Sequence, residues 1–331
     1  MPHPTHARRL LLLTLVLIAA ACTSATPTAT PVPPTPTEAP TPTPEDLPAE
    51  LVPPTLGDFD PASVSDIALE DYPVLPVVTD RARAIFAAGQ AAGNNPHVFS
   101  KIGDCMTAAA EFLTPFGGDD YDLREYGQLQ AVVDFFAGTP ARGEGFTADS
   151  FANPGLSTAS GFNAASVLDP TWADPNWCRA NESPLACEYR ASRPAFALIM
   201  FGTNDVFYTE APQFDYYLRS VVLETINRNI VPVLNTFPTR PEYPEKSLLF
   251  NQIVVRIAQD YDLPLINLWL ALQDVPNQGV DTTQTIHLTW PEDRNTGIFT
   301  GERLMTGYTF RNLVTLQAFD ALLRGLGLLD A

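Results

Sequence analysis

The stretch Val98 to Leu113, "VFSKIGDCMTAAAEFL", changes its pattern at Gly103. Before the glycine, apolar and β-branched residues are typical of a buried strand, and after it apolar residues recur at helical spacing. The pattern predicts a strand over 98–103 followed by a helix over 105–114. Cys105 therefore stands where a strand turns into a helix, which is where α/β proteins place reactive groups.

The same alternation continues along the chain. Further strands are expected at 196–202, 230–237 and 263–269, and a weaker one around 145–152. Further helices are expected over 124–137, 213–228, 246–260 and 308–327. The segment 172–193 is expected to be an insertion loop. Repeated β-α units predict an α/β fold with a mostly parallel sheet. We expect a single domain over residues 58–331.

The N-terminus has the pattern of a targeting signal. Two arginines precede an apolar run that ends in three alanines directly before Cys22, and the run is too short for a settled membrane span. It resembles the lipobox of bacterial lipoproteins, which implies a signal peptide over 1–21 and lipid attachment at Cys22. The alternative is an ordinary signal peptide that ends near a cysteine. Either interpretation predicts export.

A tether is expected between the anchor and the domain. Residues 22–57 are rich in proline and threonine, a composition that favours extended, unpacked chain. The formal net charge of −19 disfavours nucleic acid and anionic membrane surfaces as partners. Cofactor and metal are expected to be absent, because no His, Cys or carboxylate cluster has ligand spacing.

Three cysteines remain for the domain. Cys178 and Cys187 are nine positions apart in a loop-like segment, and a local disulfide between them is the simplest assignment for an exported protein. That assignment leaves Cys105 with a free thiol. Spacing alone does not exclude a pair that includes Cys105, so this alternative stays open.

Three blocks of sequence resemble the motifs of the SGNH (GDSL-like) hydrolases. They are "IGDC" (102–105), "FGTND" (201–205) and "QTIHLTW" (284–290), in the order and strand-end position that the family has. The resemblance covers roughly residues 95–327. It implies a flavodoxin-like, three-layer α/β/α sandwich around a mostly parallel sheet of about five strands.

The resemblance also implies roles for individual residues. Cys105 stands where the family has its nucleophilic serine, and His287 matches the catalytic base. Asn204 would donate its side-chain amide to an oxyanion, and the glycine that supplies a backbone amide best matches Gly161, with Gly155 as a weaker match. Gln284 occupies the position of the family's usual aspartate.

Two departures from the family pattern, serine to cysteine and aspartate to Gln284, are compatible with each other. A thiol is more acidic than a hydroxyl, and we expect the helix start and a neighbouring imidazolium to lower the pKa of Cys105. In papain-like proteases a neutral amide orients the histidine of the Cys-His pair. Gln284 could orient His287 in the same way, and Asp281 is an alternative with a carboxylate. His97 is excluded as the base because it lies near the opposite end of the first strand.

Two functions follow from this interpretation. The first is an esterase of the bacterial cell envelope, lipid-anchored and extracytoplasmic, that cleaves carboxylic esters, acetyl esters among them. Its partners would be a small ester or acylated glycan and, through the N-terminal lipid, the membrane. The alternative is a catalytically silent surface protein that binds a glycan or acyl group in the same cleft.

Overall fold

The computed structural model describes residues 53–143 and 145–330. The predicted signal peptide (1–21), Cys22 and most of the predicted linker lie outside the described residues. None of the helices in the described part of the chain combines the length and hydrophobicity that a membrane span requires.

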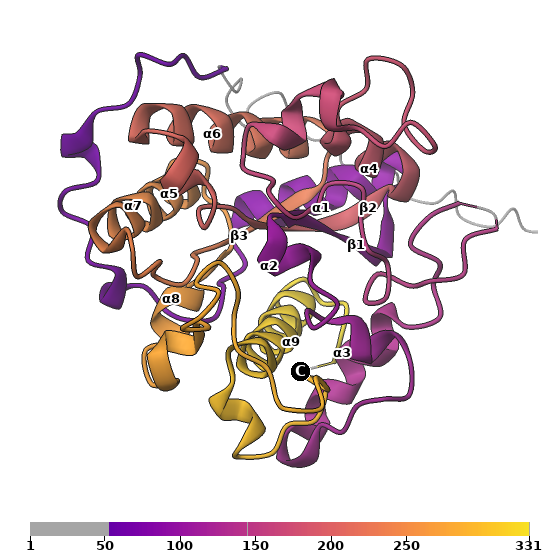
Figure 1. The fold of residues 1–331 in the computed structure, drawn as a ribbon. Helices are drawn as coiled ribbons and strands as arrows, with labels where there is room; N and C mark the ends of the chain where they lie inside the picture. Colours follow the sequence, from indigo (N-terminus) through magenta and orange to yellow (C-terminus); the bar gives the residue numbers. More distant parts are fainter. Residues whose placement is uncertain (1–52, 144, 331) are drawn as a thin grey trace, which may run out of the picture. The chain divides into compact units, whose positions relative to one another are not determined.

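A parallel sheet forms the centre of the fold (Figure 1). Its strands have the order β1-β2-β3-β4, and each pairs with the next in parallel. The bounds are β1 Asn95–Gly103, β2 Pro194–Met200, β3 Val231–Asn235 and β4 Leu265–Ile266. The expected parallel α/β sheet is confirmed. The described residues form four strands rather than about five, and the weak strand expected around 145–152 is not formed.

Helices cover both faces of this sheet, so the fold has three layers. Figure 1 shows α4 (Pro184–Ser192) and α6 (Ala211–Asn227) on one side, and α3 (Gln130–Phe136) and α9 (Gly307–Gly325) on the other. The helix α7 (Pro244–Asp260) packs beside α6. Shorter or terminal elements are α1 (Asp80–Ala92), α2 (Cys105–Ala108), α5 (Asp205–Tyr208) and α8 (Leu268–Ala271).

Aromatic side chains fill the layer between the sheet and α9. Phe99 of β1 lies 4.7 Å from Phe319 and 4.9 Å from Phe136, centroid to centroid, and Phe196 of β2 is 6.3 Å from Phe319. All four are almost completely buried. Edge-to-face and tilted pairs at these distances add to the hydrophobic stabilisation, so this cluster fixes β1 and α9 relative to each other.

The structure differs from expectation in three helical segments. The first half of the helix expected over 124–137 is a 3-10 helix (Arg124–Leu129), and α3 forms the rest. The helix that starts at Cys105 ends at Ala108, because Ala109 is extended (φ −61°, ψ 138°) and Leu113 is left-handed (φ 65°). The backbone N–H of Leu113 donates instead to Asn312 of α9 at 3.0 Å, a tertiary bond that replaces helical bonding. Part of the expected loop 172–193 forms α4, which begins with Ser183 as N-cap and a proline at its first position.

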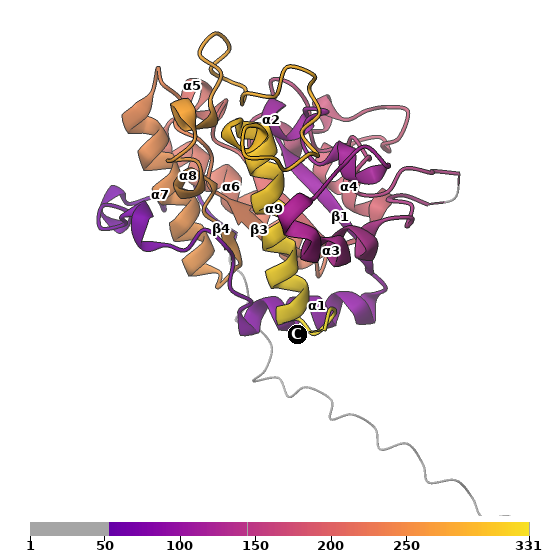
Figure 2. The same ribbon diagram turned by 90° about the horizontal axis from the view of Figure 1, so that it is seen from below.

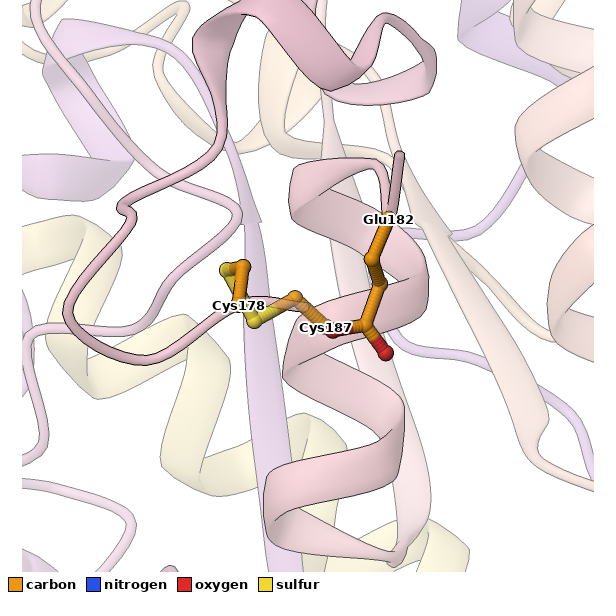
Figure 3. Close-up of side chains that lie close together, drawn as sticks. All are labelled: Cys178, Glu182 and Cys187. Atoms are coloured by element: carbon orange, nitrogen blue, oxygen red, sulfur yellow. A yellow bond between two sulfur atoms is a disulfide. The ribbon is translucent and has the colours of Figure 1, made fainter. Parts of the chain in front are cut away.

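The expected disulfide between Cys178 and Cys187 is confirmed. Glu182 lies beside it (Figure 3), and these three residues are the one group in the described chain whose potential metal-ligand atoms all lie within 4.8 Å of one another. The sulfurs are bonded to each other, and Glu182 pairs with Arg190 at 2.7 Å. The disulfide and the ion pair therefore stabilise the start of α4.

Candidate active site

Cys105 lies at the turn from β1 into α2, as the sequence predicts. Asp104 caps this short helix, because its Oδ1 accepts a hydrogen bond from Met106 N at 3.0 Å. Gly103 is required at the turn: a Cβ there would lie 2.5 Å from both Met200 O and Thr107 Oγ1. The strand and helix therefore meet so closely that the Cys105 side chain is held at the carboxyl edge of the sheet.

A cavity of about 320 Å³ opens beside Cys105. It brings together three of the predicted site residues, Cys105, Gln284 and His287, with seven others: Ala108, Ala109, Glu111, Ser160, Trp290, Arg294 and Tyr308. The loop that carries His287 lies at the same end of the molecule as α2 (Figure 2). Segments that are far apart in the sequence thus form one pocket where a parallel sheet places its ligands.

The thiol of Cys105 makes no hydrogen bond to the imidazole of His287. Its Sγ donates a hydrogen bond to the carbonyl oxygen of Ile286 at 3.3 Å. Burial, with a further contribution from the negative charge of Asp104, raises the pKa of Cys105 to about 12. The expectation of a lowered pKa is therefore wrong: α2 has only four residues, too few for a strong helix dipole, and desolvation prevails.

His287 is held by the backbone of a tight hairpin. Val280 pairs with Leu288, Asp281 N donates to His287 O at 3.0 Å, and His287 N donates to Gln284 O at 2.8 Å. Burial lowers the pKa of His287, opposed by the charges of Glu111 and Asp281 and assisted by that of Arg294. The ring is therefore a neutral base at pH 7.

Neither orienting residue expected from the sequence holds the His287 ring. Gln284 lines the pocket, but its side chain makes no hydrogen bond to another described residue. Asp281 caps the hairpin: its Oδ1 accepts from Thr283 N at 2.7 Å and Gln284 N at 3.0 Å. The ring of His287 itself has no hydrogen-bond partner among the residues described.

The predicted oxyanion donors, Asn204 and Gly161, lie on two connected segments, and neither of them lines the cavity beside Cys105. Asn204 is buried and uses one amide hydrogen to donate to Phe162 O at 2.7 Å, which leaves its second hydrogen free. Gly161 lies in the turn closed by Phe162 N and Ala159 O, has φ 85°, and follows Ser160 of the pocket wall. No described residue accepts its N–H, whereas Gly155 N donates to Asn153 at 3.2 Å. Gly161 is therefore the better donor.

Buried polar groups hold these segments in place. Asp205 accepts hydrogen bonds from Ala164 N at 2.9 Å and Gly202 N at 3.0 Å, so it joins the turn that carries Gly161 to the end of β2. On the other side, Arg311 of α9 donates to Met106 O at 2.8 Å and thereby ties α9 to α2. His97 takes no part, since it lies in β1 with Nδ1 paired to Phe135 O at 2.7 Å.

None of the seven other residues of the pocket wall was singled out in the sequence, and four of them interact in pairs or lack a partner. The Tyr308 hydroxyl is buried with no hydrogen-bond partner in the described chain, and its ring stacks on Trp290. Arg294 lies 4.4 Å above the Trp290 ring and pairs with Glu111 at 3.2 Å. Glu111 falls in the helix expected over 105–114, and Trp290 is the last residue of the third motif block. Arg294 and Tyr308 follow that block without a spacing signal.

No family model and no curated protein matches this chain. Among solved structures, a GDSL-like lipase from Bacteroides thetaiotaomicron is 15% identical, with 73% of this chain and all of that chain covered and a TM-score of 0.39. The esterase EstA from Pseudoalteromonas sp. is 15% identical, with 70% and 99% covered and a TM-score of 0.41. The acetylxylan esterase Axe2 from Geobacillus stearothermophilus is 17% identical, with 69% and 93% covered and a TM-score of 0.39.

Proposed function

We propose that this protein is a carboxylic ester hydrolase that uses Cys105 as nucleophile and His287 as base. The observation that carries the proposal is the convergence of these two side chains on one cavity at the carboxyl edge of the sheet. A nucleophile, a neutral imidazole and amide donors for the oxyanion are the parts that acyl transfer requires, and Gly161 directly follows Ser160 of the cavity wall.

The protonation states define how the reaction begins. Because the pKa of Cys105 is raised to about 12, the resting thiol is protonated at pH 7. His287, neutral at this pH, takes the thiol proton as Sγ attacks the ester carbon, so attack and proton transfer occur together. The thiol first has to turn from Ile286 O toward the imidazole. This differs from a papain-like site, where thiolate and imidazolium exist before substrate binds.

The remaining steps follow from the same residues. The carbonyl oxygen of the ester becomes an oxyanion, which the backbone N–H of Gly161 and the side-chain amide of Asn204 stabilise. The imidazolium returns the proton to the leaving alcohol, and an acyl-thioester remains on Cys105. Water then attacks the thioester while His287 accepts its proton. The tetrahedral intermediate expels the sulfur of Cys105, which takes this proton back from the imidazolium, so the carboxylic acid leaves and the thiol is restored.

The location and substrate are further parts of the proposal. The lipobox at Cys22 and the proline- and threonine-rich segment after it support an extracytoplasmic, lipid-anchored enzyme of the bacterial cell envelope. At the cell surface, an acetylated glycan is a more accessible ester than a cytoplasmic metabolite. The cavity of about 320 Å³ would hold a short acyl group and part of its alcohol.

Hydrolysis of p-nitrophenyl acetate tests the proposal. We expect turnover by the purified protein, loss of that turnover in Cys105→Ala and His287→Ala, and unchanged turnover in the matched control His97→Ala. A thioester on Cys105, trapped by acid quench and detected by mass spectrometry, would identify the nucleophile. Absence of turnover, or turnover that survives Cys105→Ala, would overturn the proposal.

A second candidate is the catalytically silent binding protein. The raised pKa of Cys105 and its hydrogen bond to Ile286 O favour it, since both suppress thiol reactivity. Alkylation by iodoacetamide across a pH series separates the two functions. An enzyme is expected to label at Cys105 through proton transfer to His287 and therefore to label more slowly in His287→Ala, whereas equal labelling rates in the wild type and in His287→Ala support the binder.

A further inference from the structure

Glu111 has a largely shielded carboxylate to which no described residue donates a hydrogen bond. Its side chain is 12% exposed, and its one ion pair in the described chain joins Oε1 to Arg294 Nε at 3.2 Å. Its backbone is fixed, because the carbonyl oxygen accepts hydrogen bonds from Thr296 Oγ1 at 2.6 Å and Asn312 Nδ2 at 2.9 Å. A carboxylate in this position has acceptor capacity to spare.

His287 lines the same cavity and lacks, within the described chain, a hydrogen-bond acceptor for its ring. Its ring has no acceptor among the described residues, and Glu111, His287 and Cys105 all line the cavity. An imidazole that takes a proton on one nitrogen is aligned and stabilised by a carboxylate on the other. The pocket thus contains the His287 ring, whose N–H has no acceptor in the described part of the chain, and the Glu111 carboxylate, which receives no hydrogen bond there.

We propose that Glu111 accepts a hydrogen bond from the His287 ring during the reaction and so positions that ring to take the proton of Cys105. The inference rests on the proposed hydrolase function and completes its proton-transfer chain. Glu111 then performs the task for which the sequence offered only Gln284 and Asp281. It comes from the segment after the nucleophile, not from the segment before the histidine.

Three observations favour Glu111 over those two. The charge of Glu111 raises the pKa of His287 more than that of Asp281 does. Asp281 is committed to the hairpin by its bonds to Thr283 and Gln284, and Gln284 is exposed to solvent. Only the carboxylate of Glu111 is both shielded from water and free of hydrogen-bond donors, so its interaction with an imidazolium is the strongest available.

Arg294 competes with His287 for this carboxylate. Its side chain is 61% exposed and rests on Trp290, so its ion pair with Glu111 is a partly solvated contact that is worth little free energy. The positive charge of Arg294 also lowers the pKa of His287. Removal of Arg294 should therefore strengthen the contact between Glu111 and His287, whereas removal of Glu111 should abolish it.

The test is an NMR titration of the histidine rings in the purified protein, paired with ester-hydrolysis kinetics. We expect the pKa of His287 to fall in Glu111→Gln and to rise in Arg294→Gln. The matched control Asp281→Asn, which keeps the acceptor that caps the hairpin, should lower it less. His97 serves as the internal reference. We expect kcat/KM to fall ~10- to 100-fold in Glu111→Gln, less than in serine triads that lose their carboxylate, and to recover in part in Glu111→Asp.

The NMR titration and the kinetics test the role of Glu111 and the hydrolase function separately. An unchanged pKa of His287 in Glu111→Gln, or a larger fall in Asp281→Asn, overturns the assignment of Glu111. A wild-type protein without turnover overturns the hydrolase function, and the titration then decides the contact alone. Thermal melts of each variant confirm folding, and the opposite signs expected for Glu111→Gln and Arg294→Gln are not produced by general destabilisation.

Discussion

The Sγ of Cys105 donates its hydrogen bond to the carbonyl oxygen of Ile286 at 3.3 Å, one residue before the base that should receive its proton. The thiol and His287 therefore share a cavity without forming an ion pair. Because the thiol is protonated and the imidazole is neutral at rest, this relationship determines the pH behaviour expected of the enzyme.

The pH profile of kcat/KM should rise once and then stay level. The neutral form of His287 is the active base, and burial holds its pKa below the ordinary value of 6.5, so activity is lost as pH falls through that lowered pKa. The thiol, with its pKa raised to about 12, adds no second change below pH 9. Initial rates between pH 4.5 and 9 measure this, and a bell with an alkaline limb below pH 9 would indicate a preformed ion pair instead.

Asn204→Ala should reduce kcat with little change in KM. In the proposed mechanism the free amide hydrogen of Asn204 binds the carbonyl oxygen only as that oxygen gains charge, and loss of one oxyanion donor costs ~10²- to 10³-fold in kcat. The variant also loses the bond to Phe162 O, so its melting temperature should be compared with that of the wild type. An increase in KM at constant kcat would show that Asn204 only binds substrate.

Gly103→Ala should destabilise the fold more than Gly161→Ala. A Cβ at 103 would lie 2.5 Å from the backbone oxygen of Met200, so the end of β1 must move away from β2 and α2. This movement costs ~1–3 kcal/mol or more. At 161 a Cβ meets open space and only the positive φ of 85° opposes it, for about 1 kcal/mol. Denaturant unfolding of both variants gives the two free energies, and equal losses would contradict the close approach at Gly103.

Replacement of Cys178 and Cys187 by serine should lower stability but not ester turnover. The bond closes a loop of sequence separation 9, for which loss of loop closure in the unfolded chain is worth roughly 2–3 kcal/mol. Neither cysteine lines the Cys105 cavity. Unfolding curves and p-nitrophenyl acetate kinetics test the two halves of the prediction, and a large loss of kcat would show that α4 supports the site.

Much of the fold was predictable because it follows from local periodicity. The expected helices 213–228, 246–260 and 308–327 agree with α6, α7 and α9 to within two residues at each end, and the parallel sheet follows from their alternation with strands. The predictions failed where tertiary contacts overrode local preference. The helix after Cys105 is cut short by the bond from Leu113 to Asn312, and the last strand shrinks because Asn267 caps α8.

The sequence by itself determined the strand-to-helix position of Cys105, the order of the three motif blocks, and the choice of His287 over His97 as the base. Only the tertiary structure decided the state of the thiol, because desolvation and the charge of Asp104 depend on what surrounds the sulfur. It likewise brought Glu111 into one cavity with His287 and paired it with Arg294, since contacts between segments so distant along the chain leave no periodic or spacing signal in the sequence.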